Sequence, residues 1–140
     1  MSQENVEIIR QKDEAFNRRD REAFLVSVDS DAEWHVTGVV VDQKTLYRGR
    51  EEIWNYATVL DEQFEELQAN FEEFFDAGDQ VVVIGRMHGR GKTSRAPVEL
   101  RWAIVVTFSE GRIVRLDNYA DKDQALEAVG LSEQDAHADS

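Results

Sequence analysis

The chain has 140 residues, of which 29 are acidic and 16 are basic, so its formal net charge at pH 7 is −13. This length predicts one domain, because an independent core usually needs about 100 to 200 residues. The excess of acid repels phosphate groups, which argues against binding to nucleic acid or to an anionic membrane. A sequence without cysteine excludes disulfides, thiolate metal sites and a cysteine nucleophile.

Targeting signals are not evident in the sequence. No apolar run approaches the ~18 residues that a membrane-spanning helix needs. The first residues lack the basic and apolar regions of a signal peptide. We therefore expect a cytoplasmic protein that does not bind a membrane.

The first half of the chain has the periodicity of helices. Apolar residues recur at three- and four-residue steps over residues 6–16, and Asp20 is positioned to cap a second helix that reaches Val28. A short extended segment is expected over residues 32–38. The most regular apolar spacing, over residues 49–67, predicts a long third helix.

After residue 68 the apolar period changes to the two-residue repeat of strands. Strands are expected at 70–77, 80–89, 98–109 and 112–120, with a polar loop at 90–97. The strand at 98–109 alternates most cleanly, because its even positions are uniformly apolar. Asp121 or Asp123 is placed to cap a last short helix that Gly130 ends. Helices followed by antiparallel strands predict an α+β domain over residues 1–131, with a flexible polar tail over 132–140.

Several polar residues occupy positions where the periodicity requires apolar ones. Lys12 interrupts the apolar stripe of the first helix, and Arg86 and His88 share one face of a strand. Asn118 lies among the apolar residues of the last strand, and His35 lies in the first extended segment. Taken alone, Lys12 would be explained as a snorkelling lysine and each histidine as a structurally satisfied group, and a buried Asn118 is expected to have a specific hydrogen-bond partner. Together, these five residues predict a polar site, provided that they converge.

An ordered set of short motifs resembles the SnoaL-like family of the nuclear transport factor 2-like superfamily. The resemblance covers residues 5–131. It rests on DEAFNRRD at 13–20, DAEWH at 31–35, YRGREEI at 47–53, GDQVVV at 78–83, GRIVR at 111–115, YAD at 119–121 and ALEAVGL at 125–131.

The resemblance implies a cone-shaped, cystatin-like fold, in which a strongly curved antiparallel sheet wraps around the N-terminal helices and encloses an apolar pocket. The even face of residues 98–108 would then line the interior. We expect a ligand to contact Lys12, Trp34, Leu100, Trp102 and Ile104. The family's relatives include polyketide cyclases, ketosteroid isomerases and limonene epoxide hydrolases, which use carboxylates inside this pocket.

The sequence departs from each of these catalytic patterns. Where the epoxide hydrolases have an Arg-x-Asp pair, the resemblance places Arg86 and His88, and their other aspartate falls on Asn118. Where the ketosteroid isomerases have their base, it places His35. Their oxyanion-binding tyrosine falls on Lys12 and their protonated aspartate falls on Ile104, so neither activity transfers directly.

The preferred hypothesis is cofactor-independent acid and base chemistry on a hydrophobic, cyclic, polyketide-like or steroid-like small molecule, of isomerase, cyclase or hydrolase type. Histidine exchanges protons near neutral pH, so His35 or His88 would be the base. Arg86, or alternatively Lys12, would stabilise developing negative charge, with Arg86 preferred, and Asn118 would orient a carbonyl group or a water molecule. The alternative is a non-catalytic module that holds an apolar ligand or mediates association.

No metal or cofactor is expected, because no fixed spacing enforces a metal site at His35 and His88. A homodimer is expected to form through the outer face of the sheet. We assign to that face a set of apolar residues interspersed with charges: Val81, Val83, Val105, Ile113 and Tyr119.

Overall fold

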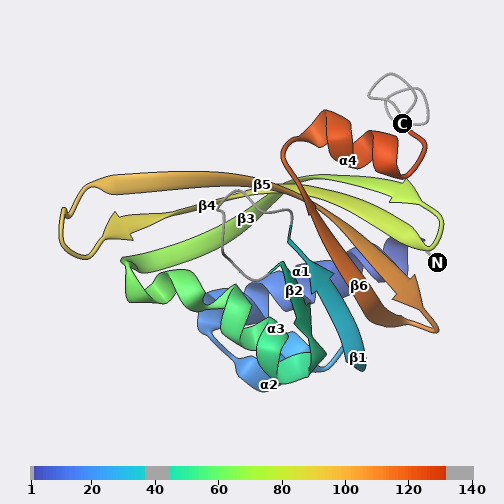
Figure 1. Cartoon of the computed structure of the whole chain (residues 1–140), viewed down its shortest axis with the longest axis horizontal. Helices are drawn as coiled ribbons and strands as arrows, with labels where there is room; N and C mark the ends of the chain where they lie inside the picture. The colour runs from blue at the N-terminus through green and yellow to red at the C-terminus, as the bar shows by residue number, and fades with distance from the viewer. Residues whose placement is uncertain (1, 37–44, 132–140) are drawn as a thin grey trace.

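The computed structural model describes residues 2–36 and 45–131 of the chain. The helical elements are α1 (Ser2–Arg18), α2 (Arg21–Leu25), α3 (Gly49–Ala57), the 3-10 helix η1 (Val59–Glu62) and α4 (Lys122–Ala128). The strands are β1 (Val28–His35), β2 (Leu46–Arg48), β3 (Phe64–Ala77), β4 (Gln80–Gly91), β5 (Pro97–Ser109) and β6 (Arg112–Tyr119). Helices α1, α2 and α3 lie on one side of the sheet, and α4 lies on the other side (Figure 1).

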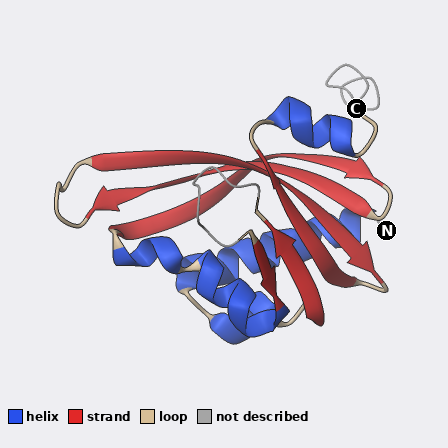
Figure 2. Cartoon of the chain, in the orientation of Figure 1, coloured by secondary structure: helices blue, strands red, loops and turns tan. Residues whose placement is uncertain are grey.

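The six strands form one sheet in the order β2-β1-β6-β5-β4-β3. The sheet curves over the three N-terminal helices and does not close on itself (Figure 2). This α+β arrangement confirms the predicted fold class. One detail differs, because β1 and β6 run parallel, whereas every other pair is antiparallel. Strands β1 and β6, the first and the last in the described sequence, are therefore neighbours in the sheet, and the strand pattern did not predict this pairing.

Two short helices begin at the predicted caps. The Asp20 side chain accepts a hydrogen bond from the backbone N–H of Ala23 at 3.1 Å. Asp121 does the same for Gln124 at 2.9 Å. Each carboxylate satisfies a backbone donor that has no partner inside its own helix.

The long helix expected over residues 49–67 is wrong. Helix α3 ends at Ala57, a single 3-10 turn follows, and β3 starts at Phe64. Strand β3 pairs with β4 from Phe64 opposite Gly91 to Ala77 opposite Gln80. This long ladder of backbone hydrogen bonds overrides the local helical spacing, because tertiary pairing routinely outweighs helix propensity.

Several other boundaries differ from the predicted ones. Val28 starts β1 and is not part of the second helix, which ends at Leu25. Strand β4 continues to Gly91, and β5 begins at Pro97, so the loop expected at 90–97 is shorter. Part of the extended segment expected at 32–38, and the whole tail at 132–140, lie outside the described residues.

The concave face of the sheet carries the main core. Even positions of β5 face the helices, as predicted, and Val106 and Phe108 are buried there. The register places Val83 opposite Ile104 and Val81 opposite Val106, so the odd positions of β4 point the same way.

The convex face is covered in part by α4. Buried Val82 and Val105 pack there against Ala125 and Leu126 of that helix. Both faces of β4 and β5 are therefore apolar near α4. The concave face packs against the N-terminal helices, and the convex face packs against α4.

The set of residues assigned to an outer dimer surface is wrong. Val81, Val83 and Ile113 belong to the core on the concave face. Val105 and Tyr119 belong to the cluster beneath α4. Dimerisation itself stays a prediction, without this apolar surface to support it.

Within the part of the chain that the structure describes, no helix combines the length and the apolar character that crossing a membrane requires.

Candidate functional site

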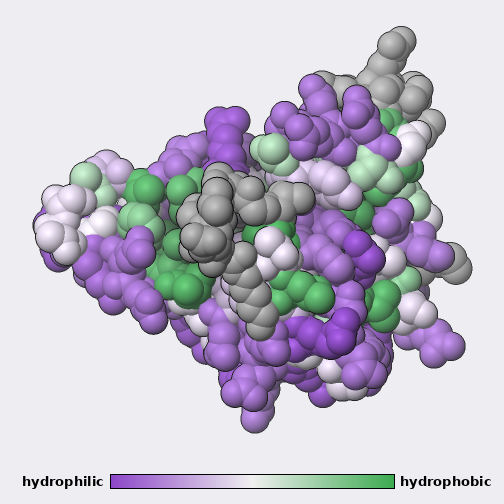
Figure 3. All heavy atoms as spheres, viewed as in Figure 1, coloured by the Kyte–Doolittle hydropathy of each residue, from purple (hydrophilic) through white to green (hydrophobic). Residues whose placement is uncertain are grey.

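A cavity of about 440 Å³ lies between the concave face of the sheet and the helices. Its walls are mainly apolar and aromatic, and they come from α1, α2, α3, η1 and all strands except β2. Val59 of η1 lines the cavity and is also 47% exposed, so the cavity reaches the surface beside η1. Hydrophobic residues gather between the long strands and the helices on the face shown in Figure 3.

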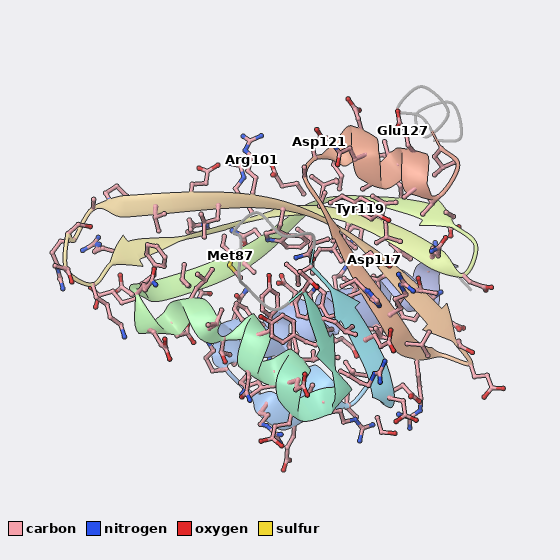
Figure 4. All side chains as sticks on the ribbon, in the orientation of Figure 1. Met87, Arg101, Asp117, Tyr119, Asp121 and Glu127 are labelled. Carbon is pink, nitrogen blue, oxygen red and sulfur yellow. The ribbon has the colours of Figure 1, made fainter. Side chains whose placement is uncertain are left out.

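Two regular elements form opposite walls. Helix α1 contributes residues at positions 9, 12, 13 and 16, whose spacing places them on one helical face. Strand β5 contributes even positions from Leu100 to Val106, as the family resemblance implied. The side chain of Met87 lies on the helical side of the sheet, whereas that of Arg101, which also borders the cavity, points away from the helices (Figure 4).

Trp102 forms part of the wall because Gly85 leaves room for its ring. A Cβ atom at residue 85 would lie 2.4 Å from the Trp102 ring and 2.8 Å from the backbone oxygen of Asn70. The ring also meets Phe71 edge to face, with centroids 5.3 Å apart. Its Nε1 is buried and has no hydrogen-bond partner among the described residues. A ligand with an acceptor group could satisfy this donor.

Lys12 brings an amine into the aromatic part of the cavity. Its Nζ lies 3.9 Å from the centroid of the Phe24 ring and 5.8 Å from that of Trp34. No acid within residues 2–36 or 45–131 forms an ion pair with it. Burial lowers the pKa of the amine to about 8, and the charge of Asp13 partly opposes this effect.

Asp13 places a carboxyl group in the same wall. Burial raises its pKa to about 7, the positive charge of Lys12 opposes the rise, and Glu14 adds to it. The sequence analysis missed this residue. The signal that selected Lys12 applies to it as well, because Asp13 follows Ile9 by four residues and precedes Phe16 by three.

A hydrogen-bonded group of three side chains forms another polar part of the wall. The Trp34 indole donates to Oδ1 of Asn118 at 2.8 Å, and the Asn118 amide donates to the Tyr56 hydroxyl at 3.5 Å. The rings of Trp34 and Tyr56 meet edge to face at 4.8 Å, and Tyr56 stacks on Tyr47. Burial raises the pKa of Tyr56, which keeps the phenol protonated and able to donate at neutral pH. Asn118 thus has the specific partner expected of a buried amide.

The chain matches the family model described as a SnoaL-like domain over residues 9–116. It belongs to the SnoaL-like domain family. The matched range includes every cavity-lining residue named above except Asn118. A comparison with curated proteins found no match.

Solved structures share the fold of this SnoaL-like domain. TerC co-crystallised with polyporic acid is 21% identical, with a TM-score of 0.73 and coverage of 90% of this chain and 98% of TerC. A putative SnoaL-like polyketide cyclase from Jannaschia sp. CCS1 is also 21% identical, with a TM-score of 0.71 and coverage of 84% and 85%.

A third structure is a hypothetical protein from Catenulispora acidiphila with a ketosteroid isomerase-like fold, in complex with trimethylamine. It is 19% identical, with a TM-score of 0.69 and coverage of 89% of this chain and 93% of that protein. At these identities the similarity shows the fold alone.

Six of the nine residues predicted for the site line the cavity of this SnoaL-like domain. They are Lys12, Trp34, Leu100, Trp102, Ile104 and Asn118.

The other three predicted residues, His35, Arg86 and His88, lie on the opposite face of the sheet, so the predicted convergence is wrong. Arg86 and His88 do share one strand face, as predicted. That face points away from the helices, because the alternate residue Met87 is the one that lines the cavity. His35 lies on the outer face because its neighbour Trp34 points inward.

These three outer residues have partners of their own. Arg86 pairs with Glu72 at 2.7 Å and with Glu99 at 3.2 Å. The Arg86 hydrogen bond holds the pKa of the Glu72 carboxyl below its usual range. His88 is exposed and contacts Asn70 at 3.4 Å.

The His35 ring contacts Glu33 at 2.8 Å, and Glu33 also pairs with Arg48 at 2.7 Å. These two contacts lower the pKa of the Glu33 carboxyl. Neither histidine lines the cavity. Among the described residues, no group of three or more possible metal ligands is positioned to hold an ion.

Proposed function

We propose that this SnoaL-like domain binds a hydrophobic, ring-containing small molecule in its cavity and transfers a proton to or from it, with Asp13 as the general base. The observation that carries the proposal is a carboxyl group in the wall of a mainly apolar cavity of about 440 Å³. Cavities of about 300 to 1,000 Å³ are typical of small-molecule sites. The proposal replaces the predicted histidine base with a carboxylate.

The shape and composition of the wall favour a flat, cyclic ligand. Rings of Phe24, Trp34, Tyr56, Phe71 and Trp102 surround the cavity. Aromatic side chains pack well against other rings through stacked or edge-to-face contacts. The fold is similar to that of a putative polyketide cyclase and to that of TerC, which was co-crystallised with polyporic acid, and this similarity is consistent with a cyclic ligand.

Asp13 has the proton affinity that a general base needs. A base works best when its pKa lies near the operating pH, and burial brings the pKa of Asp13 to about 7. Its carboxylate would remove a proton from a carbon or hydroxyl group of the ligand. The Lys12 ammonium would stabilise the anion that forms, because a charge in a dry cavity acts more strongly than in water.

Asn118 would orient the ligand. Its Oδ1 is occupied by the Trp34 indole at 2.8 Å, which fixes the amide with its N–H groups toward the Tyr56 hydroxyl. An amide held in this way can donate a hydrogen bond to a ligand carbonyl group. The proposal keeps the orienting role that the sequence predicted for Asn118.

Proton transfer can be tested without knowledge of the natural substrate. The experiment follows hydrogen-deuterium exchange at the acidic carbon of tetralone, a bicyclic ketone, by NMR in deuterated buffer. We expect the wild-type protein to accelerate exchange and Asp13→Asn to lose about a hundredfold or more of that rate. Asp31→Asn is the matched control, because Asp31 is an exposed aspartate of β1 that does not line the cavity.

The same assay also tests the histidine base predicted from the sequence and the alternative of a non-catalytic binding module. His35→Ala and His88→Ala should retain the wild-type exchange rate, because both residues lie on the outer face. Equal rates for wild type and Asp13→Asn would refute the assignment of the base. Saturable binding of tetralone without exchange would instead favour the binding module.

A further inference from the structure

The amine of Lys12 is set in the wall of the cavity, and no acid among residues 2–36 and 45–131 forms an ion pair with it. Its Nζ lies over the face of the Phe24 ring at 3.9 Å, with Trp34 at 5.8 Å. Cation–π contacts stabilise an ammonium less well than water and a carboxylate together do. The surroundings therefore favour loss of the proton, in line with a pKa of about 8. At pH 7 about one Lys12 amine in ten is then neutral and nucleophilic, which is far more than for an ordinary lysine.

We propose that Lys12 Nζ is a nucleophile that forms a reversible imine with an aldehyde or ketone group of a ligand held in the cavity. In the proposed proton transfer Lys12 acts only as a charge, so covalent attachment is an additional activity. It depends on the cavity and on Lys12, and it does not require Asp13 to be a base. A neutral lysine amine in a desolvated pocket is a recognised way to activate this nucleophile.

The reaction balances with groups already present in the cavity. The lone pair of neutral Nζ attacks the carbonyl carbon, and the carbon–oxygen π pair moves to oxygen. The nitrogen then releases one of its two hydrogens as a proton, and the oxygen takes up one proton. The resulting carbinolamine loses its hydroxyl group, with one added proton, as water, and the nitrogen gives up its second hydrogen as a proton. The net result is one carbon–nitrogen double bond and one water per ligand, with no oxidant or reductant.

Several titratable side chains line the same cavity and could donate or accept the protons that imine formation requires. Asp13 from α1, Tyr56 from α3 and Glu62 from η1 all line the cavity with Lys12. Asp13 in its protonated form could supply the proton that removes water from the carbinolamine. Arg101 borders the cavity, but its side chain points away from the helices (Figure 4), so it contributes no donor there.

Reductive trapping tests the proposal directly. The folded protein is incubated at pH 7 with naphthaldehyde and sodium cyanoborohydride, which converts an imine to a stable amine, and the modified peptides are mapped by mass spectrometry. The chain has four lysines to compare: Lys12, Lys44, Lys92 and Lys122. We expect labelling of Lys12 to be at least tenfold faster than that of Lys92, which is exposed. It should saturate with aldehyde and be slowed by naphthalenemethanol, a competitor without a carbonyl group.

One variant and one matched control complete the test. Lys12→Arg keeps a cation but cannot form an imine, so fast labelling should disappear, while circular dichroism reports whether the fold is intact. Lys92→Met should label like the wild type. Labelling of Lys12 in wild type that is no faster than that of Lys92, or that ignores the competitor, would overturn the proposal.

The Asp13→Asn variant distinguishes the two proposals. Trapping at Lys12 in this variant, together with normal tetralone exchange, would support the imine and refute Asp13 as the base. Loss of exchange without trapping in the wild type would support the base and refute the imine.

Discussion

Replacing Asp13 by asparagine should stabilise the protein at neutral and alkaline pH while removing its proton-transfer activity. The carboxyl group has a pKa of about 7 in the fold, against 3.8 as the ordinary value. The native state therefore binds a proton more tightly than the unfolded state does. The contribution of Asp13 to the free energy of unfolding of the wild type thus falls as pH rises from about 4 to 7.

Without any reduction for solvent screening, the difference of about 3 between the two pKa values corresponds to roughly 4 kcal/mol in the free energy of unfolding. Asp13 is only half-buried, and solvent screening reduces such effects, so we expect Asp13→Asn to gain about 2 kcal/mol at pH 8. The gain should fall close to zero by about pH 3, where wild-type Asp13 is protonated in the native state and mostly protonated in the unfolded state.

Urea unfolding at a series of pH values measures this difference. Asp31→Asn makes the same chemical change and the same change in net charge at an exposed position, so it controls for long-range charge effects. The reasoning is refuted if the difference between Asp13→Asn and wild type is independent of pH, or if it matches that of Asp31→Asn.

Three further substitutions give distinct expected outcomes. Lys12→Met should raise the free energy of unfolding by about 2 kcal/mol at pH 7, measured in urea, because it removes the cost of a buried charge. The gain should fade between pH 8 and 10.5, where the native-state amine is already neutral. A gain that grows over this pH range would contradict the lowered pKa of Lys12. Gly85→Ala should destabilise the protein by about 1 to 3 kcal/mol and alter tryptophan fluorescence, because its Cβ would overlap the Trp102 ring. Unchanged fluorescence and stability would show that the ring moves freely. Asn17→Ala should cost about 2 to 3 kcal/mol in thermal or urea unfolding, because the Asn17 side chain makes two hydrogen bonds, of 2.7 and 3.0 Å, to the backbone of buried Ala69 in the edge strand β3. A cost below about 0.5 kcal/mol would mean that water replaces both bonds.

Local signals in the sequence predicted the features that depend on neighbouring residues. A short polar side chain before a helix caps it through bonds that span three residues, so Asp20 could be assigned directly and the last cap could be narrowed to Asp121 or Asp123, of which Asp121 is the cap. The alternation of β5 separated its apolar face from a face that carries charge over much of its length, and the family resemblance placed the apolar face inside. In contrast, the spacing at 49–67 fits a helix until β4 offers β3 a partner, which no local pattern reports.

The candidate site was only partly predictable because alternation defines two faces of a strand without saying which one faces the helices. In β4 both faces are apolar near the turn, since α4 covers Val82 on the outside while Val83 belongs to the inner core. The polar pair Arg86 and His88 could thus be placed on one face, but its direction could not be known. Asp13 shows the opposite case, because its position on the apolar stripe of α1 was available in the sequence and was not used.

The parallel pairing of β1 with β6 also determines when the cavity can exist during synthesis. Trp34 leaves the ribosome early, and Asn118, which accepts its indole hydrogen bond at 2.8 Å, comes 84 residues later. Contacts of such long sequence separation form slowly, because a large loop must close before they provide any stabilisation. Until β6 docks, the hydrophobic rings that later form the cavity have no complete wall and are open to wrong partners. A ligand that requires the finished cavity would therefore bind only to chains that have completed this last step, and would act as a reporter of full folding.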